Sequence, residues 1–197
     1  MQLKLRSSRK HLYTFNLMLP ADNSDIIKEL EKETWIPDEA GYGQSQFPTR
    51  FRIRQVQSNI LREIEQYVEH GKFKHQIIDQ LYQAPEFAAM WGVDPAKMDQ
   101  QTFIYGVFTK DLPGYLIRIH TDDRMHVAQG MIYFIPTDDP DQSTIFYTSF
   151  EGDNPMRIPT GPGAGYVAAN TNNSWHTGKN ASTQDRYSLI FGIRLNL

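Results

Sequence analysis

Two histidines and two aspartates lie within seven positions of one another in the segment IRIHTDDRMH (117–126). If this segment begins as an extended strand, alternate side chains point to one side, so His120 and Asp122 can converge on one ion while Asp123 points away. The following TDDRM is typical of a turn, which predicts a surface position for His126 and a turn-forming, solvated or ligand-supporting role for Asp123. Taken alone, the H-x-D pair is explained somewhat better by a turn-capping aspartate beside a buried histidine.

A metal site here needs a third ligand from a later strand. His176, in NTNNSWHTG, stands at the mouth of a predicted strand, whereas the other histidines fall in the turn, the helical half or the N-terminal leader. Two imidazoles and one carboxylate on one face of an ion form the donor set of non-haem Fe(II) sites, which keep positions open for substrate and oxygen. The candidate metal ligands are therefore His120, Asp122 and His176.

Ten residues after His176, the run RYSLIFGIR predicts a strand on which Arg186 and Ser188 share a face. The opposite face is apolar, with Leu189, Phe191, Ile193 and Leu195. An arginine beside a metal site is well placed to hold a carboxylate through charge-assisted, bidentate hydrogen bonds, and a serine two residues later can donate another.

These residues need a scaffold, and the hydrophobic period of the chain changes near residue 100. Before it, apolar residues recur at three- and four-residue steps, which is typical of amphipathic helices that cover a core. We expect helices over 20–37, 49–72 and 72–85, and a strand in 12–19. The second helix includes Ile53 and Val56 in its apolar stripe.

After residue 100, short runs rich in β-branched and aromatic residues alternate with turn clusters. We expect strands in 101–109, 114–120, 130–136, 143–149, 164–170 and 186–197. Short strands at this spacing, with no helix between them, favour an antiparallel sandwich or barrel with the helices packed on one outer face.

Strand alternation also orients the segment GYLIRIH (114–120). Tyr115, Ile117 and Ile119 should share one face and Leu116, Arg118 and His120 the other. We expect the first set to pack against the helices and the second to face the interior.

The composition excludes several classes of protein. A net charge of −3 gives no sign of a general nucleic-acid binder, and the absence of cysteine removes disulfides, thiolate ligands and cysteine nucleophiles. The longest apolar run, near 87–93, is too short to span a bilayer, and the basic leader lacks an apolar signal segment. We expect a soluble, cytoplasmic protein without a membrane partner.

The H-x-D pair (120–122), the distal His176 and the R-x-S run (186–188) together resemble the Fe(II)- and 2-oxoglutarate-dependent dioxygenases. Within residues 101–197 the chain is similar to small prolyl-hydroxylase-like members of that superfamily. The length of the chain favours one domain, residues 1–197, and the resemblance implies that its mainly helical part over 1–100 braces the core. Residues 101–197 would form the core, a double-stranded β-helix (jelly-roll or cupin-like barrel) in a mainly β, α+β fold.

The resemblance also implies the roles of the candidate residues. His120, Asp122 and His176 would bind Fe(II), Arg186 would pair with the distal carboxylate of the cosubstrate 2-oxoglutarate, and Ser188 would assist. Reaction with O2 would release succinate and CO2 and hydroxylate an unactivated C–H bond in a small molecule or a protein side chain.

Four further residues are candidates for the pocket, each with an alternative role. Tyr133 could help to hold 2-oxoglutarate, although Phe134 could occupy the equivalent place. Arg118, Trp175 and Arg194 could face the substrate, the alternatives being packing for Trp175 and a surface or ion-pair role for the arginines.

Three points stay open in the sequence. Residues 38–50 could form a lid or substrate loop, while the substrate and the oligomeric state cannot be predicted. A non-catalytic jelly-roll binding or structural module is the main alternative function. A cupin-like metalloenzyme that uses no 2-oxoglutarate comes last, because Arg186 would then have no clear role.

Overall fold

The computed structural model describes residues 5–9, 12–38, 49–70, 72–123, 125–171 and 174–196, so the loop predicted at 38–50 lies mostly outside the described residues. Its helices are α1 (Asn23–Lys32), α2 (Asn59–His70), α3 (Phe73–Leu81), α4 (Pro85–Trp91) and α5 (Pro95–Gln100), with a 3-10 helix, η1, at Pro140–Gln142. Its strands are β1 (Leu5–Arg9), β2 (Leu12–Asn16), β3 (Trp35–Pro37), β4 (Arg50–Ile53), β5 (Thr102–Asp111), β6 (Tyr115–Leu116), β7 (His126–Tyr133), β8 (Thr144–Phe146), β9 (Met156–Arg157), β10 (Ala164–Ala169), β11 (His176–Asn180) and β12 (Arg186–Leu195). None of the described helices is long and apolar enough to cross a membrane.

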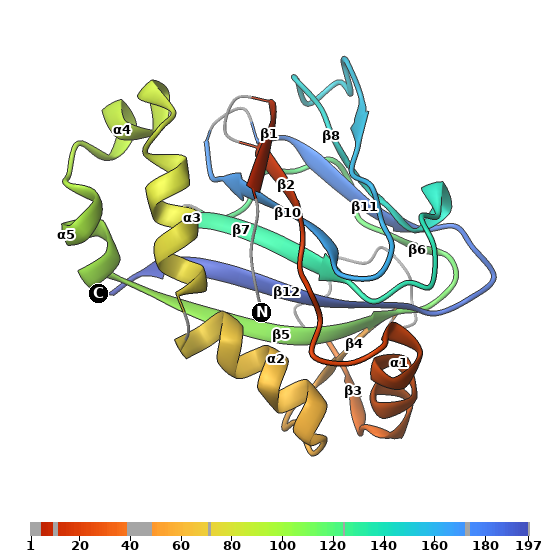
Figure 1. Cartoon of the computed structure of the whole chain (residues 1–197). Helices are drawn as coiled ribbons and strands as arrows, with labels where there is room; N and C mark the ends of the chain where they lie inside the picture. Colours follow the sequence, from red (N-terminus) through yellow and green to blue (C-terminus); the bar gives the residue numbers. More distant parts are fainter. Residues whose placement is uncertain are drawn as a thin grey trace.

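The described strands form two antiparallel sheets (Figure 1). The large sheet has the order β1-β2-β10-β7-β12-β5-β4-β3, and the small sheet has the order β6-β11-β8-β9. The prediction of a mainly β, antiparallel architecture with helices is therefore confirmed. Strands from the first hundred residues add to it, because β1 and β2 form one edge of the large sheet and β4 and β3 the other.

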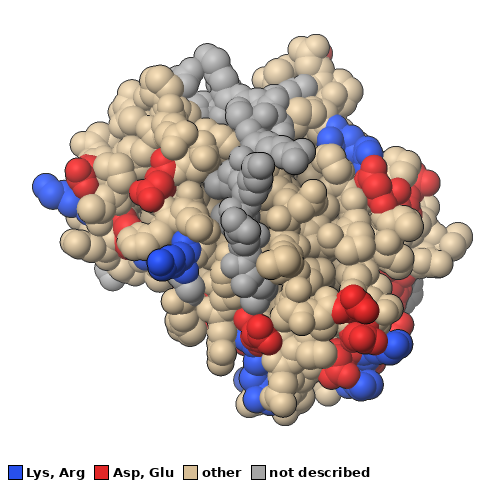
Figure 2. Space-filling view, viewed as in Figure 1, with Lys and Arg blue, Asp and Glu red and all other residues tan. Residues whose placement is uncertain are grey.

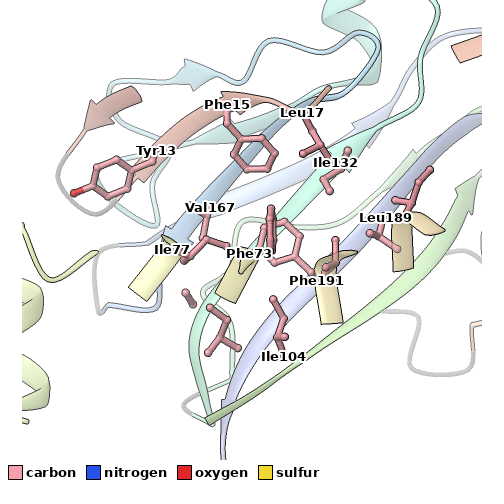
Figure 3. Packing of buried hydrophobic residues seen from close by; sticks show 14 of the residues in the cluster. Tyr13, Phe15, Leu17, Phe73, Ile77, Ile104, Ile132, Val167, Leu189 and Phe191 are labelled. Carbon is pink, nitrogen blue, oxygen red and sulfur yellow. The ribbon is translucent and has the colours of Figure 1, made fainter. Parts of the chain in front are cut away.

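Apolar side chains cover both faces of the large sheet, because neighbouring residues of a strand point to opposite sides. One face packs against the helices, where Phe73 and Ile77 of α3 meet Phe191 and Val167 of the sheet (Figure 3). The rings of Phe73 and Phe191 meet edge to face, with centroids 4.9 Å apart. The other face packs against the small sheet through Met131, Tyr133, Tyr166, Ala168 and the β8 residue Phe146. The apolar face predicted for the last strand, with Leu189, Phe191, Ile193 and Leu195, packs against the helices.

The helix predicted over 49–72 is wrong at its start. Residues Arg50–Ile53 form β4 instead, paired with both β3 and β5. The helix begins only at Asn59. The two residues before it, Gln57 and Ser58, donate their backbone N–H groups to the buried carboxylate of Glu33. A carboxylate at a helix N-terminus satisfies free N–H groups and complements the helix dipole. Because Glu33 lies far back in the sequence, local periodicity could not place this boundary.

The first predicted helix also ends early. Helix α1 stops at Lys32, and Trp35–Pro37 pairs with β4 as strand β3. Apolar residues near a helix end fit either structure, and the available sheet edge decides between them.

The orientation predicted for residues 114–120 is wrong for its first residues. Tyr115 is buried beside the guanidinium groups of Arg50 and Arg186 rather than against the helices, whereas Leu116 is 59% exposed. Strand β6 contains only two residues, and the chain bends at Ile119. A single alternating strand therefore does not run from Gly114 to His120.

Charged side chains of both signs are interspersed on the face of the molecule in Figure 2. The best-formed exposed pair joins Arg157 and Asp138 through two hydrogen bonds of 2.7 and 2.6 Å. Exposed ion pairs of this kind contribute up to about 1 kcal/mol to stability, because water screens them and ordering the side chains costs entropy.

Replacing Gly130 of β7 by alanine is expected to lower the free energy of unfolding by about 1–3 kcal/mol. A Cβ atom there would overlap the carbonyl oxygen of Tyr166 and the ring of Phe191. Gly106→Ala is the matched control, because its Cβ would meet only the flexible end of Leu189, at 3.3 Å. We expect the control to change stability by less than about 1 kcal/mol. Urea unfolding of both variants measures the difference, and equal effects would contradict the packing described for β7.

Candidate metal centre

The three predicted ligands lie together. His120, Asp122 and His176 each bring one ligand atom within 4.8 Å of the other two. Oδ1 of Asp122 is 3.9 Å from Nε2 of His120 and 3.7 Å from Nε2 of His176. One ion could therefore contact all three atoms after small side-chain rotations.

Backbone carbonyls fix the tautomer of both histidines. Nδ1 of His120 lies 2.8 Å from the carbonyl oxygen of Arg118, and Nδ1 of His176 lies 3.0 Å from that of Ser174. A carbonyl oxygen can only accept, so each Nδ1 carries the proton and donates it. Each Nε2 then presents a lone pair toward Asp122, which is how imidazoles that bind metals are usually held.

Three segments of the chain hold the ligands. His120 and His176 form an isolated antiparallel bridge, in which each backbone N–H donates to the other carbonyl, at 3.0 and 2.9 Å. The ring of Phe146 in β8 stacks on His176 with centroids 5.1 Å apart. Asn170, just after β10, donates from its side chain to the carbonyl of Asp123 at 2.6 Å, which fixes the turn after the ligand aspartate.

Burial sets the electrostatics of the site. It lowers the pKa of His176 and, together with the neighbouring His176, the pKa of His120. Burial raises the pKa of Asp122, against the opposing effect of His120. Neutral imidazoles are the form that binds metals, and a buried carboxylate is costly without a cation to neutralise it. The donor set therefore fits a divalent ion.

A cavity of about 650 Å³ lies beside the ligands. Pockets for small molecules typically measure about 300–1,000 Å³. Among the described residues, its walls are formed by Asp38, Arg50, Tyr105, Tyr115, Ile117, Arg118, His120, Thr121, Asp122, Asp123, His126, Gln129 and Arg194. Three arginines and three aspartates give this wall charges of both signs.

A second charged cluster, here called the arginine ladder, consists of Arg50, Asp111 and Arg186. These residues lie directly opposite one another on β4, β5 and β12. Arg50 donates from Nε and Nη2 to the two oxygens of Asp111, at 2.6 and 2.9 Å. Arg186 donates from Nε and Nη2 to Oδ2 of Asp111, at 3.0 and 2.5 Å. The ladder thus joins three neighbouring strands through one carboxylate.

The carboxylate of Asp111 and the guanidinium groups of the arginine ladder stay charged despite their burial. Burial opposes the charged form of Asp111, but the two guanidinium charges outweigh this effect and lower its pKa. For the same reason, the carboxylate of Asp111 outweighs burial and raises the pKa of Arg50. Two arginines and one aspartate leave the ladder with one net positive charge.

Arg186 and Ser188 lie fully buried on the face that the sequence predicted. The Oγ atom of Ser188 is 2.8 Å from Oγ1 of Thr109. Tyr133 is buried on the same side of the sheet and donates its hydroxyl proton to Oγ1 of Thr144, at 2.8 Å. Neither Arg186 nor Tyr133 is among the described residues that line the cavity.

The remaining pocket candidates divide into two groups. Arg118 and Arg194 line the cavity, and Nη2 of Arg194 is 3.5 Å from Oδ2 of Asp123. Trp175 packs instead against Phe150, with ring centroids 5.5 Å apart, and is not among the described residues of the cavity wall.

The prediction that His126 lies on the surface is wrong. The turn is present, since the N–H of His126 donates to the carbonyl of Asp123, but β7 begins at this histidine and buries it. Its Nε2 lies 2.8 Å from the hydroxyl of Tyr105, and both side chains line the cavity. Short turns bounded directly by strands give no sequence signal for the first buried residue.

Sequence reasoning also missed Arg50, Asp111, Tyr105 and Tyr115. The sequence did carry a signal for Asp111. It is a charged residue at the end of an apolar strand, and its side chain points to the same face as that of Thr109. Arg50 carried none, because its segment has a helical period.

Comparisons with known proteins agree with this architecture. No protein-family model and no curated protein sequence matches the chain. Solved structures do match. A prolyl-4-hydroxylase from Pseudomonas putida is 16% identical, with 95% of this chain and 94% of that chain covered and a TM-score of 0.58. A Burkholderia pseudomallei oxidoreductase of the 2OG-Fe(II) oxygenase family is 13% identical, with 93% and 84% covered and a TM-score of 0.56.

A third match is a prolyl hydroxylase from Trichoplax adhaerens, in complex with a peptide fragment of the hypoxia inducible factor oxygen degradation domain. It is 10% identical, with 94% of this chain and 84% of that chain covered and a TM-score of 0.60. The chain therefore has the fold of the 2OG-Fe(II) oxygenases, and the resemblance seen in its sequence is confirmed at the level of the fold.

Proposed function

We propose that this protein is an Fe(II)- and 2-oxoglutarate-dependent dioxygenase, built on a double-stranded β-helix formed by its two sheets. It hydroxylates a small molecule or a protein side chain and releases succinate and CO2. The observation that carries the proposal is the convergence of His120, Asp122 and His176, in which Oδ1 of Asp122 lies 3.9 and 3.7 Å from Nε2 of the two histidines.

In this proposal the three ligands hold Fe(II), which together with 2-oxoglutarate and O2 supplies the oxidising chemistry. The chain supplies orientation and charge. The carbonyls of Arg118 and Ser174 keep the protons of both histidines on Nδ1, so that neither ring has to lose a proton when metal binds.

The arginine ladder supplies the positive charge for the distal carboxylate of 2-oxoglutarate. Arg186 is the residue that the resemblance assigns to this carboxylate, with Ser188 beside it. Buried aromatic residues between the two sheets, Tyr133, Phe146 and Tyr166, keep water away from this side of the site.

Two observations support a substrate of either class. The cavity is large enough for a small molecule or a single side chain, and Arg118 and Arg194 offer charged donors on its wall. The Trichoplax adhaerens protein with the same fold is in complex with a peptide fragment, which supports a protein side chain as one of the two candidates.

Titration with 2-oxoglutarate under anaerobic conditions tests this function. We expect calorimetry to detect 2-oxoglutarate binding to the Fe(II)-loaded protein, little binding without metal, and none to His120→Ala. A non-catalytic jelly-roll module, or a cupin-like enzyme that uses no 2-oxoglutarate, would show no metal-dependent binding of the cosubstrate. That result would contradict the proposal.

A further inference from the structure

The two arginines of the ladder differ in what they can still bind. The side chain of Arg186 is 0% exposed, and four of its N–H groups already have acceptors. Two of them donate to Asp111, and Nη1 donates to the carbonyls of Lys179 and Gln142, at 2.9 and 3.3 Å. Arg186 therefore ties Asp111 and the large sheet to the segments that carry those carbonyls.

Arg50 is held by the same carboxylate but faces the other way. Its side chain is 15% exposed, and it lines the cavity together with His120 and Asp122. Its bonds to Asp111 use Nε and Nη2, so Nη1 takes part in neither of them. The ring of Tyr115 lies beneath its guanidinium group, 4.3 Å from ring centroid to Cζ, and supports it from one face.

A guanidinium group fixed on one edge by a carboxylate and on one face by an aromatic ring can offer its remaining edge to a second carboxylate. Fixing it in advance lowers the entropy cost of binding. The net positive charge of the ladder also favours one added anion, against the opposing charge of Asp38 on the same cavity wall. Arg50 meets these conditions on the cavity wall. Arg186 does not, because its N–H groups already donate to Asp111 and to two backbone carbonyls, and it is not among the described residues of the wall.

We propose that Arg50, rather than Arg186, makes the direct contact with the distal carboxylate of 2-oxoglutarate, and that Asp111 and Arg186 are positioning residues. This inference rests on the proposed function, because it assumes that 2-oxoglutarate enters the cavity beside the three metal ligands. The residue that binds this carboxylate would then lie on β4, within the first hundred residues.

The test compares two ligands that differ only in the distal group. 2-Oxopentanoate has the carbon chain of 2-oxoglutarate without the second carboxylate. Binding of each to the Mn(II)-loaded, full-length protein is measured by calorimetry for wild type, Arg50→Gln, Arg50→Lys and the control Arg52→Gln. Arg52 is an exposed arginine on the same strand and is not among the described residues of the cavity wall.

We expect Arg50→Gln to weaken 2-oxoglutarate binding roughly 10- to 100-fold, the range for hydrogen bonds between charged groups. Binding of 2-oxopentanoate should change by less than about threefold, a difference below 1 kcal/mol. Arg50→Lys keeps the charge without the planar fork, so it should retain part of the preference for 2-oxoglutarate. Arg52→Gln should resemble wild type.

The assignment to Arg50 would be overturned if Arg50→Gln kept the wild-type preference for 2-oxoglutarate over 2-oxopentanoate. If Arg50→Gln fails to fold, the same preference at its full wild-type size in Arg50→Lys would overturn it. An equal loss of both ligands would also overturn it, because a distorted metal site and not a lost carboxylate contact would then be the cause. If wild type with Mn(II) binds neither ligand, the proposed function itself fails, and the assignment fails with it.

Discussion

Asp122→Asn will largely remove the stabilisation that a divalent metal gives to the folded protein. A metal at 100 times its dissociation constant stabilises a fold by about 2.7 kcal/mol. Asp122 supplies the only carboxylate of the described ligand set, and its Oδ1 faces both histidines. Loss of a residue that merely supports a ligand costs about 10- to 100-fold in metal affinity, so losing the anionic ligand should cost at least as much. Thermal unfolding with and without Mn(II) measures the effect.

The adjacent carboxylate provides the control. Asp123 is 55% exposed, accepts a hydrogen bond from the N–H of Met125 and lies near Arg194, outside the ligand set. Asp123→Asn should keep the full response to Mn(II). A normal response in Asp122→Asn, or an equal loss in both variants, would contradict the assignment of the ligands.

Asp111→Asn is expected to lower the free energy of unfolding by about 3–5 kcal/mol. It leaves the buried guanidinium group of Arg186 and the largely buried one of Arg50 without their carboxylate. Asp111 is fully buried and bonded to both Arg50 and Arg186. Asp138→Asn is the matched control, since Asp138 also binds an arginine through two hydrogen bonds but is 48% exposed. The control should cost about 1 kcal/mol or less. Urea unfolding at pH 7 compares the two, and similar losses would show that the ladder adds nothing beyond a surface pair.

The stability of the ladder should also depend on pH. Because the arginines hold the pKa of Asp111 below its ordinary value of 3.8, the folded protein binds the proton more weakly than the unfolded chain does. The stabilisation by this carboxylate is therefore complete above that ordinary value and is lost as the pH falls through the lower folded value. The difference between wild type and Asp111→Asn should be constant from pH 7 to about pH 5 and should narrow below pH 3.8. A difference that does not narrow would mean that Asp111 does not act through its charge.

The ligand set could be predicted because its members depend on residue type and approximate strand position. His120 and Asp122 needed only a spacing of two, and His176 only a place at the start of a strand that returns beside them. The local geometry differs from a regular strand, since His120 joins the small sheet through a single bridge to His176. The donor atoms still converge, because the short Thr121 connection leaves Asp122 little freedom.

The arginine ladder could not be predicted, because it depends on the register of three strands. Arg50 lies in a segment with a helical hydrophobic period, and only pairing with β3 and β5 makes that segment a strand. Arg186 was predicted to face inward, and it does. No local pattern in the sequence indicates that its guanidinium group is already bound to the carboxylate of Asp111. His126 was misplaced for a related reason, since a turn directly followed by a buried strand looks the same in sequence as a longer exposed loop.

Turnover of 2-oxoglutarate in the absence of a prime substrate tests the central claim most directly. The Fe(II)-loaded protein should convert 2-oxoglutarate to succinate in the presence of O2, and the reaction should stop when Fe(II) or O2 is withheld and in Asp122→Asn. Asp138→Asn, which changes an exposed carboxylate that is not among the described residues of the cavity wall, should form succinate at a rate close to wild type. If the protein binds both Fe(II) and 2-oxoglutarate but forms no succinate, or forms it equally well in Asp122→Asn, then these three residues are not the centre of a dioxygenase.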